Sequence, residues 1–141
     1  MAFHCTRAII RPHKLVRRLF TSSDKVTVSQ ALDKITAELD AAAVPESGMS
    51  SKYLLSHVLG ESKSNGYAKF SDRELAVHQL TDLNRLVACR LARMPLQYIV
   101  GSWDFRNIQL KLKPPVFIPR PETEQLVQIV LDTLPFDKPL R

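Results

Sequence analysis

The residue types that could carry metal or cofactor chemistry are scattered along this chain. Histidines stand at positions 4, 13, 57 and 78, and the cysteines at 5 and 89 share no ligand spacing with them. A protein metal site needs three or four such ligands in a compact pattern, so no metal site is predicted. The chain also has only four glycines, and they never cluster as backbone around a bound phosphate requires.

The size and composition predict a globular chain rather than a disordered one. Its 141 residues leave room for at most one whole domain and a fragment of another. The hydrophobic fraction of 45% and the charged fraction of 24% are ordinary for packed domains. With Cys5 in the basic N-terminal segment, Cys89 stands alone in a predicted helix, which indicates a small buried side chain and excludes a disulfide framework.

The net charge of +6 is mostly a property of the N-terminus. Residues 1–20 hold five basic side chains and no acidic one, whereas residues 21–141 hold 15 basic and 14 acidic ones. On a helix, four of these basic side chains lie within about 60° of one another, namely Arg7, Arg11, Lys14 and Arg18. The opposite side of that helix is apolar and ends in Leu19 and Phe20. This pattern predicts a mitochondrial transit peptide over residues 1–26, cleaved near residues 21–27, and location in the matrix. The alternative is a solvated basic arm or a nucleic-acid tail.

Four short helices are predicted between Thr27 and Arg93. Thr27 and Gln30 form a capping box before a helix over about 28–43. A turn over 45–50 precedes a second helix, which Gly60 is suited to end. A second capping box, Ser71 with Glu74, opens a third helix, and Thr81 is expected to cap a fourth that runs through Leu91. Together these elements predict a small helical bundle.

Beyond Pro95 the pattern changes to strands and then returns to a helix. Apolar residues over 97–113 predict two strands joined by a turn near 104–107. Pro114 and Pro115 end them, and Pro121 is placed to open a final helix that stops before Pro135. Aliphatic side chains cover an arc of about 200° on that helix, which is far wider than the stripe of a surface helix.

Two segments in this region form a specific signature. The first is Arg93-Met94-Pro95-Leu96-Gln97-Tyr98-Ile99-Val100-Gly101, and after Phe105 the second is Phe117-Ile118-Pro119-Arg120-Pro121-Glu122-Thr123-Glu124. Their order and spacing closely resemble the signature of the HemK family of protein-glutamine N5-methyltransferases, also called PrmC. The segment 53–60 is similar to the family's second bundle helix, so the resemblance covers roughly residues 27–134.

The resemblance implies a fold class and an activity for the complete enzyme. The expected fold is mainly α, with a helical substrate-recognition bundle (27–93), a β-hairpin linker (94–118) and, from residue 119 to 141, the first helix of a truncated α/β methyltransferase domain. Such enzymes use S-adenosyl-L-methionine to methylate the glutamine of the Gly-Gly-Gln motif in peptide-chain release factors. With its leader, this chain resembles the mitochondrial member, and its expected partner is the mitochondrial release factor.

The family's cofactor loop, Asp-x-Gly-x-Gly, and its Asn-Pro-Pro-Tyr loop do not occur in these residues. Pro114-Pro115 is flanked by Lys113 and Val116, and no glycine follows Gly101. Methyl transfer to an amide nitrogen depends on holding donor and acceptor in line, so this chain alone is not expected to be catalytic or to bind the cofactor. No catalytic residue is therefore assigned.

The resemblance assigns binding roles to a few residues, each with a structural alternative. Arg120, Glu122 and Thr123 are cofactor-side candidates in the complete enzyme, or else they make a salt-bridged helix N-terminus. Trp103 and Phe105 are substrate-binding candidates, or else they form the hairpin's packing.

Two classes of function stay open at this point. One is the recognition portion of a release-factor methyltransferase, and the other is a non-catalytic helical module that docks a release factor or the ribosome. A monomer without membrane association and without strong nucleic-acid binding is expected in either case.

Overall fold

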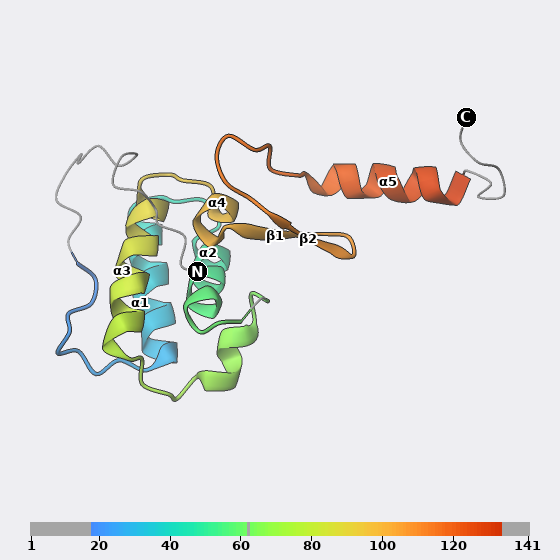
Figure 1. Ribbon diagram of the computed structural model, residues 1–141. Coiled ribbons are helices and arrows are strands. Elements are labelled where there is room, and N and C mark those ends of the chain that lie inside the picture. The colour runs from blue at the N-terminus through green and yellow to red at the C-terminus, as the bar shows by residue number, and fades with distance from the viewer. Residues whose placement is uncertain (1–17, 62, 134–141) are drawn as a thin grey trace. The chain divides into compact units, whose positions relative to one another are not determined.

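The computed structural model describes residues 18–61 and 63–133. The predicted transit peptide therefore lies mostly outside the described residues, as does the C-terminal stretch 134–141. The chain divides into two compact units at the junction of Val100 and Gly101. The fold is mainly α with one small β-hairpin, as predicted (Figure 1).

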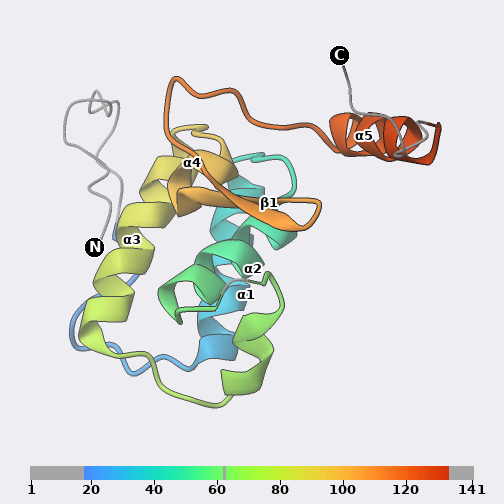
Figure 2. The ribbon, with the colours of Figure 1, turned by 45° about the vertical axis from the view of Figure 1, so that its right-hand side comes forward.

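The first unit is a helical bundle. It contains the helices α1 (Val28–Ala41), α2 (Ser47–Val58), α3 (Val77–Leu91) and α4 (Leu96–Val100), with a 3-10 helix, η1 (Gly66–Phe70), between α2 and α3. The first three helices pack against one another, and α4 packs on α2 and α3 (Figures 1 and 2). Their shared faces bury the core, whose fully enclosed members include Val28, Ile35, Leu39, Leu54, Leu55, Leu80, Leu83 and Cys89.

Local signals place the start of α1 and the end of α2 as predicted. The Thr27 hydroxyl accepts a hydrogen bond from the Gln30 backbone N–H, and the Gln30 side chain accepts one from Thr27 N–H, so the capping box is complete. Gly60 follows the end of α2 with a φ of +79°, a conformation that glycine adopts without steric cost.

Three predicted boundaries in the bundle are wrong. The predicted turn over 45–50 is short, because α2 already begins at Ser47. The Ser71–Glu74 capping box does not form, because residues 71–76 are not helical and α3 begins only at Val77. The Ser71 carbonyl instead accepts a hydrogen bond from Ser29 N–H at the start of α1. Thr81 caps no helix either, because its hydroxyl donates to the Val77 carbonyl four residues earlier. The predicted third and fourth helices are therefore replaced by the single helix α3.

The second unit holds the strands β1 (Ser102–Phe105) and β2 (Ile108–Lys111), followed by α5 (Pro121–Thr133). The strands form an antiparallel hairpin whose turn is Arg106 and Asn107, within the predicted interval. The first predicted strand begins later than expected, since Tyr98 to Val100 belong to α4. The final helix begins at Pro121 as predicted, and none of its side chains is buried.

Candidate functional site

One face of the hairpin gathers the two aromatic candidates. Trp103 and Phe105 lie two residues apart on β1, so their side chains project from the same face. The register pairs Trp103 with Leu110 and Phe105 with Ile108, which makes this face apolar, and we call these four residues the hairpin face. Both aromatic side chains are half-buried, while Ile108 is 58% exposed. The hairpin face can therefore offer an apolar contact surface to a partner.

The hairpin turn is tied to α5 by a residue that the sequence analysis did not single out. The backbone N–H of Arg106 donates to Glu124 Oε2 at 3.1 Å, and its guanidinium Nη2 donates to Gln128 Oε1 at 2.7 Å. Gln128 in turn donates to Asp132 at 2.7 Å. Glu124 closes the second signature segment, so this part of the signature fixes the turn to the helix. In the sequence, the family signature is the only feature that points to Glu124, and nothing points to Arg106.

The three cofactor-side candidates lie together at the N-terminus of α5. Arg120 precedes the helix and its carbonyl accepts a hydrogen bond from Thr123 N–H at 3.0 Å, while Glu122 lies in the first turn. All three side chains are exposed. Among the residues that the structure describes, the ion pairs are Lys69–Glu61 and Arg85–Asp82, so Arg120 and Glu122 do not form the salt bridge that was the structural alternative.

The described residues of the second unit do not enclose Arg120, Glu122 and Thr123. A cofactor of the size of S-adenosylmethionine needs a concave site that covers most of its surface. Within the described part of the second unit, residues 101–133, Leu112 is the one buried residue, so the unit has no core that could enclose a ligand. The described residues also contain no group of three or more His, Cys, Asp or Glu side chains able to hold a metal ion.

The first signature segment has a structural role in the bundle. Arg93 donates from Nη1 to the Ala43 carbonyl and from Nη2 to the Ala42 carbonyl, both at 2.8 Å, and so closes the C-terminus of α1. One turn earlier, Arg90 donates to the buried Ser50 hydroxyl at 3.0 Å. Burial lowers the pKa of Arg90 from its ordinary value. These arginines join the C-terminal end of α3 to α2 and to the loop that precedes it, and neither contact has a separate signal in the sequence.

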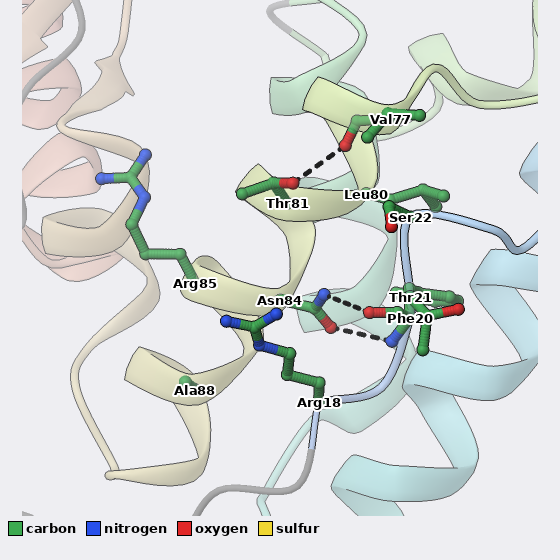
Figure 3. A pocket seen from close by; sticks show the side chains of 10 residues that line it. All are labelled: Arg18, Phe20, Thr21, Ser22, Val77, Leu80, Thr81, Asn84, Arg85 and Ala88. Carbon is green, nitrogen blue, oxygen red and sulfur yellow. Dashed lines mark hydrogen bonds between the residues drawn. The ribbon is translucent and has the colours of Figure 1, made fainter.

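A cavity of about 360 Å³ lies in the first unit. It is bounded by the non-helical segment that precedes α1 and by one face of α3, with Arg18, Ser22, Thr81 and Arg85 around it (Figure 3). Phe20 and Leu80 contribute its apolar part. Trp103, Phe105, Arg120, Glu122 and Thr123 are not among its lining residues.

The class of protein follows from these features: a small helical bundle followed by a hairpin and a helix whose apolar side is uncovered. Residues 30–101 match the family described as the PrmC N-terminal domain, and the chain belongs to that family. The match includes all of the first signature segment, which confirms the resemblance found in the sequence.

Several curated proteins are similar to this chain over its larger part. The MTRF1L release factor glutamine methyltransferase of Homo sapiens is 43% identical over 98 residues, which is 69% of this chain and 29% of that protein. The release factor glutamine methyltransferase of Vibrio cholerae is 36% identical over 107 residues, 76% of this chain and 37% of that protein. That of Coxiella burnetii is 34% identical over 116 residues, 82% and 41% respectively. The chain thus spans between about three tenths and two fifths of the length of these relatives.

In the described part of the chain, no helix combines the length and the apolar character that crossing a bilayer requires.

Proposed function

We propose that this chain is the N-terminal, substrate-recognising portion of a mitochondrial protein methyltransferase. The complete enzyme uses S-adenosyl-L-methionine to methylate the glutamine of the Gly-Gly-Gln motif in a peptide-chain release factor. The family match over residues 30–101 carries this proposal, and the similar proteins, which are release factor glutamine methyltransferases, support its substrate. The bundle and hairpin recognise the release factor, and the helix α5 begins the catalytic part.

The proposed division of labour follows from what the described residues can and cannot do. They offer an apolar hairpin face and a rigid bundle, which are suited to binding. The cofactor-side candidates at the start of α5 are exposed, and we assign the chemistry to a part of the complete enzyme beyond these residues. We propose that Arg120, Glu122 and Thr123 face the cofactor once the catalytic part of the complete enzyme covers α5. In this arrangement the chain acts as a monomer.

The hairpin face gives the most direct test of recognition. Replacing Trp103 by alanine is expected to weaken binding of a purified release factor by about tenfold or more, because truncating a central aromatic contact commonly costs 1.4 kcal/mol or more. Calorimetric titration of the 141-residue chain measures the dissociation constant. The matched control is Gln109→Ala, which removes an exposed side chain from the opposite face of the same hairpin and is expected to leave binding unchanged.

The two variants separate recognition from packing. Thermal unfolding of Trp103→Ala shows whether the hairpin still folds. If the variant stays folded and binds the release factor as tightly as the original chain, or if the original chain does not bind at all, the hairpin face has no recognition role and the proposal loses its substrate-binding site.

The N-terminal segment is proposed to direct the protein to the mitochondrial matrix. Residues 1–27 fused to a fluorescent reporter are expected to send it to mitochondria, because import depends on a basic amphipathic helix. Replacing Arg7, Arg11, Lys14 and Arg18 by glutamine is expected to leave the reporter in the cytosol. Fluorescence microscopy against a mitochondrial marker decides between the two. Mitochondrial signal from the glutamine version would contradict the charge-dependent explanation, and nuclear signal from the original would favour a nucleic-acid tail.

A further inference from the structure

The residues just before α1 are built into the bundle. Phe20 is 1% exposed, which places it among the most completely buried side chains of the chain. The side chain of Asn84, on α3, clamps its backbone: Oδ1 accepts hydrogen bonds from the N–H groups of Leu19 and Phe20, both at 2.9 Å, and Nδ2 donates to the Phe20 carbonyl at 2.7 Å. Figure 3 shows Asn84 reaching from α3 to this segment.

The chain continues from the clamp through an ordered turn. Thr21 donates to the carboxylate of Asp24 from its N–H at 2.9 Å and from its hydroxyl at 2.7 Å, and Asp24 N–H returns a bond to the Thr21 carbonyl. These donors lower the pKa of Asp24 below its ordinary value. Two residues later the Val26 carbonyl accepts from Leu75 N–H at 2.9 Å. Residues 19–26 are thus attached to the bundle at both ends.

This arrangement corrects part of the sequence prediction. Leu19 and Phe20 were assigned to the apolar side of a targeting helix, but they are not helical, and Phe20 packs into the bundle core instead. A cut at residues 21–27 would remove Phe20. It would leave the Asn84 amide, which is half-buried, without its three partners, and it would open the core where the ring lies.

We infer that proteolytic removal of the leader stops before Leu19, so that the mature chain keeps residues 19–26 as part of its fold. The inference rests on the proposed mitochondrial targeting for the existence of a leader, while the attachment of the segment stands on the contacts alone. The cleavage is a hydrolysis by a matrix endopeptidase: one water adds across a peptide bond at or before the one that joins Arg18 to Leu19, which leaves a carboxylate on the leader and an α-amino group on the mature chain. The family match begins at residue 30, downstream of this segment.

The N-terminus of the imported protein tests the inference directly. The full chain, carrying a C-terminal affinity tag, is expressed in cells, recovered from purified mitochondria and sequenced at its N-terminus by mass spectrometry. The expected first residue is Leu19 or one that precedes it. A mature chain that begins at residue 20 or at any later residue would overturn the inference.

Limited trypsin digestion of the purified 141-residue chain tests the attachment without any import. Cleavage after Lys25 is expected to be at least about tenfold slower in the original chain than in the Asn84→Ala variant, although the Lys25 side chain is exposed, because a protease must first detach the segment from the bundle. Equal rates in the two chains would overturn the inference. If targeting fails while this difference in rates is observed, the proposed localisation is wrong but the structural role of the segment stands.

Substitutions provide a second readout on the same chain. Phe20→Ala and Asn84→Ala are each expected to lower the midpoint of thermal unfolding, by roughly 10 °C for the Phe20 change, and to speed cleavage after Lys25. The matched control is Ser22→Ala, an exposed position in the same segment that is expected to change neither. Variants of Phe20 and Asn84 that melt and digest like the original chain would contradict the clamp.

Discussion

Ending the chain after Lys113 is expected to make it more soluble than the 141-residue form. The reason is α5, where Leu126 is 59% and Ile129 is 61% exposed, and Val130 and Leu131 are exposed as well. Covering four such side chains is worth about 6 to 12 kcal/mol in total, which is comparable with the whole stability of a small domain, about 5 to 15 kcal/mol. A bare apolar surface of this kind favours aggregation. Soluble yield after expression and light scattering on heating compare the two forms.

Charged substitutions on α5 separate the effect of its apolar side from the effect of chain length. Leu126→Lys combined with Ile129→Glu is expected to recover most of the solubility gained by trimming. The matched control, Gln125→Lys combined with Asp132→Glu, changes the polar side of the same helix and is expected to leave the aggregation unchanged. If the unmodified 141-residue chain is more soluble and melts higher than the trimmed form, α5 has found cover within this chain, and its assignment to a larger catalytic domain loses its physical support.

The elements that follow local rules could be predicted from the sequence. The capping box at Thr27 and the proline at the first position of α5 act within one helical turn, so both helices begin where expected. The segment 71–75 could not be predicted, because its carbonyls accept hydrogen bonds from the start of α1, more than 40 residues earlier in the chain. There a tertiary contact prevails over a local capping signal. The apolar run from Tyr98 to Val100 is similarly ambiguous, since a short run of this kind suits a strand or a helix.

In the candidate site too, local features could be predicted from the sequence and tertiary contacts could not. Side chains alternate between the two faces of a strand, so Trp103 and Phe105 lie on one face of β1. The hairpin face could therefore be predicted from the sequence. The bond from Arg106 to Glu124 depends on how the turn lies against α5, and the clamp by Asn84 joins groups 64 and 65 positions apart. No periodicity encodes such contacts. The burial of Phe20 was missed because a basic amphipathic pattern and a buried aromatic anchor overlap in the same few residues.

The largest effect on activity is expected from completing the chain. Holding donor and acceptor in line supplies about 7 to 11 kcal/mol of a typical barrier reduction, and we expect these residues alone to hold neither reactant in that way. The 141-residue chain is therefore expected to show no binding of S-adenosylmethionine at millimolar concentration and no methyl transfer. A joined protein can be made from residues 1–133 followed by the part of the human relative that lies after its matched region. We expect the joined protein to bind one equivalent of S-adenosylmethionine and to transfer its methyl group to a release factor. Calorimetry and a radiolabelled methyl donor measure both properties on both proteins.

The central claim is that this chain directs a methyltransferase to the glutamine of the Gly-Gly-Gln motif, and peptide mass spectrometry of the reacted release factor tests it most directly. With the joined protein, one added methyl group is predicted on that glutamine and on no other residue, and Trp103→Ala is predicted to reduce its formation while Gln109→Ala does not. A joined protein that folds and binds S-adenosylmethionine, yet leaves the glutamine unmodified or methylates a different residue, would contradict the account.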